Sequence, residues 1–162
     1  AWISPSFPKS RAMPEASGAI LAFDFGLKRI GVAIGTCLAP GHLAAARPLT
    51  TIAAEAGDAR FAAIAALIAE WQPQRLLVGR PLNDDGTPHA MTARCERFAD
   101  QLRGRFRLPV EAVDERYSSV AADAGMRERG LDWGQRKARV DAEAALIILN
   151  DWNDTHARSA TA

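Results

Sequence analysis

The stretch AILAFDFGLKRIGVAIGT, residues 19–36, decides the fold of this chain. It consists of two apolar runs joined by the turn-like residues GLK, a pattern that predicts a β-hairpin. One acid, Asp24, lies inside the first run between two phenylalanines. Because side chains alternate along a strand, Asp24 shares a face with Ala22, opposite the two phenylalanine rings. An ionised acid in such a strand is costly unless a partner compensates, so Asp24 is a candidate functional residue.

The sequence after residue 36 predicts one more strand of this sheet, then alternating helices and strands. The predicted elements are a strand near 46–52, a helix with Asp58 as its N-cap that ends at Pro73, a strand at 75–80, a helix that Thr87 caps and Pro88 begins, a strand at 109–113, and helices at about 118–129 and 135–152. This order, β-β-β-α-β-α-β-α-α, predicts an α/β protein with a mixed sheet and helices on its faces.

Composition and length indicate one domain and exclude several classes of protein. The chain has 162 residues and 20 basic against 19 acidic side chains, which excludes a tail that coats nucleic acid through charge alone. Its two cysteines lie far apart without a CxxC motif, which argues against structural zinc and a disulfide framework. No apolar run approaches the roughly 20 residues that span a bilayer. We therefore expect a soluble, cytoplasmic protein with a disordered leader at 1–18, a single domain at 19–152 and a flexible tail at 153–162.

Two further acids, Glu115 and Asp141, lie where a functional site is expected. Glu115 follows the last predicted strand, and open α/β sheets bind ligands at the carboxyl ends of their strands. Its neighbour Asp114 must point the other way, so only one of the two faces a site there. Asp141 begins an apolar stripe of the final helix that continues through Ala144, Ala145, Ile148 and Trp152, which puts its carboxylate on the buried face.

Taken together, Asp24, Glu115 and Asp141 predict a shared carboxylate cleft. Converging carboxylates repel one another, and oxygen ligands favour hard ions such as Mg²⁺ or Mn²⁺. Paired ions of this kind serve displacement at phosphorus. The alternatives are structural: Asp24 caps the turn at Gly26, and Glu115 is a solvated loop acid.

Four motifs resemble those of a known family, the YqgF-type nucleases of pre-16S ribosomal RNA, which are related to Holliday-junction resolvases. The matching segments are FDFGLKRIGVAIG (23–35), VGRPLNDDGT (78–87), VDERYSS (113–119) and KARVDAEAALIIL (137–149). The resemblance implies a ribonuclease-H-like fold, a five-stranded mixed sheet flanked by helices. It also implies Mg²⁺- or Mn²⁺-dependent phosphodiester cleavage in 5′-end maturation of small-subunit ribosomal RNA, with the family's catalytic acids at Asp24, Glu115 and Asp141. Arg80 and Tyr117 stand where the family often has leucine.

Several residues near the predicted cleft are candidates for nucleic-acid binding. Lys28 and Arg29 lie in the turn after Asp24, and Arg116 follows Glu115. Asn83 lies in a loop after a strand end. The basic stretches 94–107 and 127–139, the second of which contains Lys137, are either phosphate contacts or solvated helix faces.

Three functions remain open from the sequence. The first is a nuclease acting on structured RNA, either pre-16S ribosomal RNA or ribosomal particles. The second is a resolvase acting on branched DNA, which requires a homodimer, whereas the RNA nuclease is compatible with a monomer. The third is a binding module without catalysis that uses the same cleft.

Overall fold

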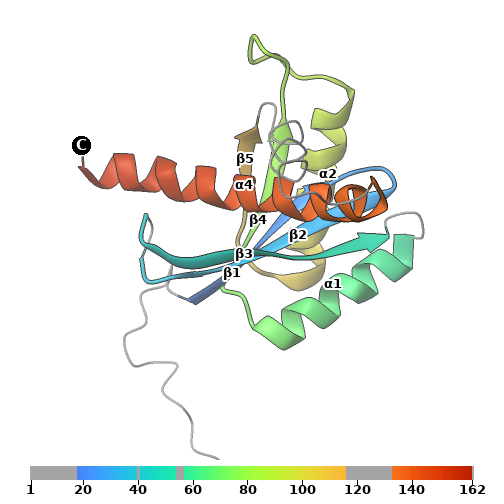
Figure 1. Ribbon diagram of the computed structural model, residues 1–162, viewed down its shortest axis with the longest axis horizontal. Coiled ribbons are helices and arrows are strands. Elements are labelled where there is room, and N and C mark those ends of the chain that lie inside the picture. Colours follow the sequence, from blue (N-terminus) through green and yellow to red (C-terminus); the bar gives the residue numbers. More distant parts are fainter. Residues whose placement is uncertain (1–17, 40, 54–56, 116–132, 162) are drawn as a thin grey trace, which may run out of the picture.

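The computed structural model describes residues 18–39, 41–53, 57–115 and 133–161 (Figure 1). Its elements are β1 (Gly18–Phe25), β2 (Arg29–Cys37), β3 (Leu43–Ala53), α1 (Gly57–Trp71), β4 (Arg75–Pro81), α2 (Ala90–Phe106), β5 (Val110–Glu115) and α4 (Trp133–Thr161). Residues 1–17 of the predicted leader at 1–18 and the predicted helix at 118–129 lie outside the described residues, and Gly18 is the first residue of β1. None of the described helices is long and apolar enough to cross a membrane.

The strands form one five-stranded sheet in the order β3-β2-β1-β4-β5. The β1–β2 and β2–β3 pairs are antiparallel, and β1–β4 and β4–β5 are parallel. The hairpin closes where the Gly26 N–H donates to the Arg29 carbonyl at 2.9 Å. The prediction of a mixed sheet flanked by helices is therefore confirmed, and β1 lies at its centre.

Alternation along β1 divides the core into two layers. Leu21 and Phe23 belong to a cluster with residues of α1 and α2, including Phe98, whose ring meets Phe23 edge-on at 6.0 Å. Ile20 and Ala22 belong to a second cluster with α4. Figure 1 shows α4 running across the strands on its side of the sheet. Asp24, which continues the Ile20 and Ala22 series, therefore faces α4.

Glycines allow α4 to approach β2 closely. A Cβ atom on Gly31 would lie 1.7 Å from the backbone oxygen of Asp141, and one on Gly35 would lie 2.7 Å from Leu149. Opposite them, Ala144 and Ala145 are fully buried, as expected for small residues at a tight helix contact. The absence of side chains at these two glycines thus lets α4 pack directly against β2.

Two helix starts differ from the predictions. The helix α1 begins at Gly57, so Asp58 lies in its first turn rather than at the N-cap. The cap of α2 is His89, not Thr87: its ring accepts the Met91 N–H at 3.1 Å, and Thr92 accepts the His89 N–H in return. Thr87 instead donates its hydroxyl to Asp85 within the preceding loop.

The final helix is longer than predicted. It runs from Trp133 to Thr161, past the expected end at 152, so that most of the predicted tail at 153–162 is helical. Asn153 accepts the Leu43 N–H at 3.0 Å, and Gly41 lies against the backbone of Ala157. These contacts with β3 and the loop before it supply the stabilisation that the polar sequence of this segment lacks.

Candidate active site

Asp24 and Asp141 meet across the β1–β2 hairpin. Asp24 pairs with Gly31, and the side-chain directions of two paired residues lie on the same face, about 5 Å apart. The backbone of Asp141 occupies the space that a Gly31 side chain would need. The absence of a side chain at Gly31 therefore brings the start of the α4 stripe beside Asp24.

Glu115 reaches the same place from the other side. It is the last residue of β5 and only 8% exposed, which excludes a solvated loop acid. The strand β4 separates β5 from β1, but Gly79 of β4 leaves a gap: a Cβ atom there would lie 2.8 Å from Glu115 Oε1. Through this gap the Glu115 carboxyl group forms a hydrogen bond with that of Asp24.

The surroundings of Asp24 favour its neutral form. Burial first, then the charges of Glu115 and Asp141 and the hydrogen bond with Glu115, raise the pKa of Asp24 to about 8. A hydrogen bond between two carboxyl groups needs a proton on one of them, which agrees with a protonated Asp24 at neutral pH. The alternative role for Asp24, capping the turn, is excluded because the Gly26 N–H is bonded to Arg29.

The charge of Asp141 is balanced by Arg29. The Arg29 Nε atom lies 2.8 Å from Asp141 Oδ2, and both side chains are mostly shielded from solvent, at 33% and 21% exposed. Arg29 is thus an internal counter-ion at the site. Asp114, by contrast, is 61% exposed and pairs with Arg80 at 3.0 Å, as expected from its opposite orientation to Glu115.

The three acids supply the oxygen ligands that a hard divalent cation prefers, but their side chains are not oriented to bind one ion together. Among the described residues, no three His, Cys, Asp or Glu side chains are arranged to hold a metal ion together. Two features account for this: Asp24 shares a hydrogen bond with Glu115, and Asp141 is turned towards Arg29. A cation that replaces the proton and the guanidinium group would meet an all-oxygen donor set, the kind that Mg²⁺ and Mn²⁺ prefer.

The predicted nucleic-acid-binding residues are distributed more widely. Lys28 is exposed in the hairpin turn next to Arg29. Asn83 is exposed and donates to Thr87 Oγ1 at 3.0 Å and to the Pro88 carbonyl at 3.3 Å, so it shapes its own loop. Arg116 and the side chain of Lys137 lie outside what the structure describes. Of the five, Arg29 is the residue whose contact with a predicted acid is observed.

Gly79 is a site residue that sequence reasoning missed. It interrupts the buried run RLLVGR, and an isolated glycine inside a strand signals the close approach of another group. That signal was present in the sequence, but it did not reveal that the approaching group is the Glu115 side chain.

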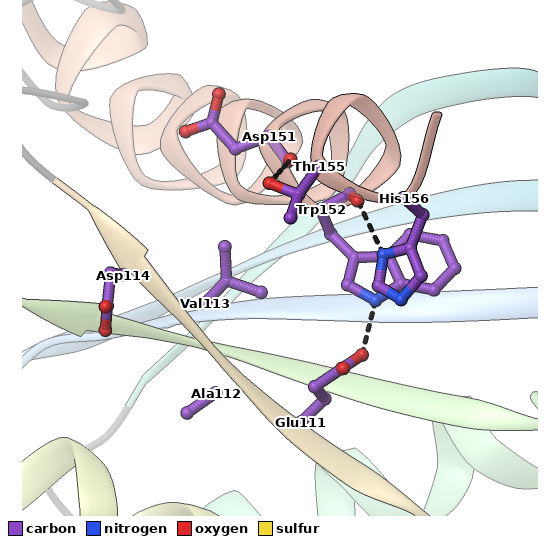
Figure 2. Close-up of a pocket in the computed structure, with 8 residues that line it drawn as sticks. All are labelled: Glu111, Ala112, Val113, Asp114, Asp151, Trp152, Thr155 and His156. Atoms are coloured by element: carbon purple, nitrogen blue, oxygen red, sulfur yellow. Dashed lines mark hydrogen bonds between the residues drawn. The ribbon is translucent and has the colours of Figure 1, made fainter. Parts of the chain in front are cut away.

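A second hollow, of about 380 Å³, lies between β5 and α4, away from the acids. Figure 2 shows the Trp152 and His156 rings side by side among its lining residues, and their planes are tilted by 43° with centroids 4.5 Å apart. The Trp152 Nε1–H donates to Glu111, and His156 Nδ1 lies 2.9 Å from the Trp152 carbonyl oxygen. Because these lining groups bond to one another, we interpret the pocket as a packing gap between β5 and α4 and not as a ligand site.

The sheet and its acids define a ribonuclease-H-like protein with a carboxylate site. Residues 18–155 match the family model described as "RuvX: Holliday junction resolvase". The chain therefore belongs to the RuvX family and is a nuclease, a hydrolase of phosphodiester bonds.

Two curated relatives agree with this assignment. The chain is 51% identical over 135 residues to a protein of Dechloromonas aromatica named "Putative pre-16S rRNA nuclease", covering 83% of this chain and 90% of that one. A protein of Burkholderia multivorans with the same name is 53% identical, covering 83% and 88%. Among solved structures, RuvC of Thermus thermophilus matches with a TM-score of 0.47 and 19% identity over 88% of this chain and 97% of that one.

Proposed function

We propose that this protein is a divalent-metal-dependent endonuclease that cuts precursor RNA during 5′-end maturation of 16S ribosomal RNA in the cytoplasm. The observation that carries the proposal is the gathering of Asp24, Glu115 and Asp141, from three separate elements, around the half-buried carboxyl group of Asp24. The names of its relatives support pre-16S ribosomal RNA as the substrate.

In this proposal Asp24, Glu115 and Asp141 are the catalytic acids and would hold Mg²⁺ or Mn²⁺. Such ions, when bound, activate water and stabilise the leaving oxygen of a phosphodiester. Asp24 would hold the ion as a carboxylate, which requires loss of the proton that its raised pKa favours in the metal-free protein. Gly79 and Gly31 fix the directions from which Glu115 and Asp141 approach.

Arg29 and Lys28 bind the substrate in this proposal. If Asp141 held a cation, its ion pair with Arg29 would weaken, and the Arg29 guanidinium would be available to bind a phosphate oxygen. Lys28, one residue earlier in the exposed turn, adds a second positive charge. Asn83, Arg116 and Lys137 are further candidates for contact with the RNA strand.

A second candidate function is resolution of branched DNA, which the description of the family model favours. A symmetric four-way junction calls for a homodimer, whereas RNA trimming within a ribosomal particle is possible for a monomer. Light scattering, together with cleavage assays on a labelled four-way DNA junction and on a 16S precursor with its 5′ extension, separates the two. Cutting of the junction by a dimer, with the precursor left intact, would favour the resolvase.

The decisive test compares Glu115→Gln with Asp114→Asn. The two acids are adjacent, but Glu115 is buried beside Asp24, whereas Asp114 is exposed and directed away. We expect the Glu115 variant to fold, to lose Mn²⁺ binding in calorimetry and to lose cleavage, while the Asp114 variant keeps both. Equal cleavage by the two variants would refute the catalytic site, and RNA binding without turnover in any divalent ion would favour a binding module.

A further inference from the structure

A pocket of about 180 Å³ on the other face of the sheet is lined by basic side chains. Its lining residues come from the end of β1 and its turn, from α1 and from α2, and are Phe25, Leu27, Arg60, Arg94, Arg97 and Gln101. No acid is among them. Phe25 directly follows Asp24 in β1, so the pocket and the carboxylate site lie at the same strand end, on opposite faces of the sheet.

Arg94 and Arg97 are not explained by internal ion pairing. Both are exposed, and in the part of the chain that the structure describes no acid pairs with either of them. The neighbouring acids of α2 are already paired with other arginines: Glu96 with Arg80 at 2.8 Å, and Asp100 with Arg103 at 2.6 Å. The last turn of α2, where the helix dipole favours positive charge, contains Arg103 and Arg105 instead.

Arg60 and Leu27 complete the shape of the pocket. The Arg60 guanidinium lies over the rings of Phe25 and Phe61, with its Cζ atom 5.5 and 5.0 Å from their centroids. Such stacking orients a planar group that binds phosphate through two parallel hydrogen bonds. Leu27 is 57% exposed beside the pocket, an unusual position for a large apolar side chain.

We propose that this arginine pocket binds the phosphodiester backbone of the substrate strand next to the cleavage site. Arg60, Arg94 and Arg97 contact phosphate oxygens, and Leu27 packs against a ribose or base. The strand then passes over the end of β1, from the acids on the α4 side to the pocket on the α2 side. This inference rests on the proposed function, because the RNA strand that it places in the pocket is the substrate of the proposed nuclease.

The test measures binding without cleavage, in EDTA, by fluorescence anisotropy of a labelled single-stranded RNA. On single strands, counterion release lowers the logarithm of the binding constant by about 0.7 per tenfold increase in salt for each phosphate contact. At about 0.1 M salt, loss of one such contact therefore weakens binding about fivefold. We expect Arg94→Gln and Arg97→Gln each to lose about this much, and the double variant about 25-fold, with a shallower slope. Leu27→Ala should weaken binding and leave the slope unchanged.

Arg47→Gln is the matched control, because it removes the same charge from an exposed arginine of β3, outside both the pocket and the basic stretch 94–107. A double variant that binds RNA like this control, or a wild type that binds no RNA, overturns the inference. The inference is also overturned if the variants bind labelled polyglutamate more weakly than wild type but bind RNA equally well. That result would indicate that the pocket binds an acidic protein partner. If the variants lose RNA binding as expected but the wild type never cleaves in Mn²⁺, the pocket stands and the nuclease proposal for this site fails.

Discussion

Replacing Asp24 by asparagine is expected to stabilise the metal-free protein and to abolish its activity. Asparagine has the shape of the protonated acid, and its amide can donate to Glu115 as the carboxyl proton does. In wild type the pKa of Asp24 rises from 3.8 to about 8 on folding, so folding at neutral pH must take up a proton. Over the roughly three pKa units between 3.8 and about pH 7, this uptake costs up to about 4 kcal/mol.

The sign of the pH dependence follows from the direction of the shift. An acid whose pKa is raised in the folded state contributes its stability fully below 3.8 and loses it as the pH rises towards 8. Wild type in EDTA should therefore lose stability between about pH 4 and about pH 8, and Asp24→Asn should lose less. The gain of the variant should be largest near pH 8 and close to zero near pH 4.

Urea denaturation in EDTA at several pH values measures this difference, with Asp114→Asn as the control. Asp114 is exposed, and its ion pair with Arg80 is screened by solvent, so its variant should follow the wild-type pH profile. Added Mn²⁺ should stabilise wild type and leave Asp24→Asn unchanged. A folded Asp24→Asn that is no more stable than wild type near pH 8 would refute the description of Asp24 as a strained, protonated acid.

Four further substitutions, of which Gly104→Ala is a control, test the arrangement around the acids. Gly31→Ala, whose Cβ would collide with the backbone of α4, should cost more than about 3 kcal/mol in chemical denaturation. Gly104→Ala, an exposed helix position with no atom nearby, should gain about 0.5–1 kcal/mol, and equal effects of the two would contradict the close approach of α4. Arg29→Gln should bind Mn²⁺ about tenfold more tightly in calorimetry, since the Arg29–Asp141 attraction that the ion must overcome is of the order of 1–4 kcal/mol. Weaker Mn²⁺ binding by this variant would show that Arg29 supports the site instead of competing for it. Trp152→Phe should lower the unfolding midpoint without changing Mn²⁺ affinity, because its indole contacts Glu111, outside the acid cluster.

The alternation of side chains made much of the fold predictable. Strand periodicity placed Asp24 on the face of Ala22, and helix periodicity placed Asp141 on the buried stripe of the last helix, both of which the structure confirms. Adjacent positions on a strand point in opposite directions, and this rule separated Glu115 from Asp114. Such local rules apply because they depend only on the backbone geometry of one element.

What the sequence could not provide depends on contacts between elements. The gap at Gly79 has meaning only when β5 is known to lie beside β4 and Glu115 to point across it. The helical part of the predicted tail is stabilised by Asn153 and its partner in β3, which no local pattern indicates. The Arg29–Asp141 pair joins residues 112 positions apart, beyond the reach of any motif.

The close packing of α4 against Gly31 also determines when the three acids come together in a newly synthesised chain. The hairpin that contains Asp24 is synthesised before α4, the helix that supplies Asp141. Until the final helix docks, the nascent protein lacks one of its three acids. If the three acids are catalytic as proposed, the enzyme would be inactive until α4 has docked, and so would not cut a ribosome precursor while it is still being synthesised.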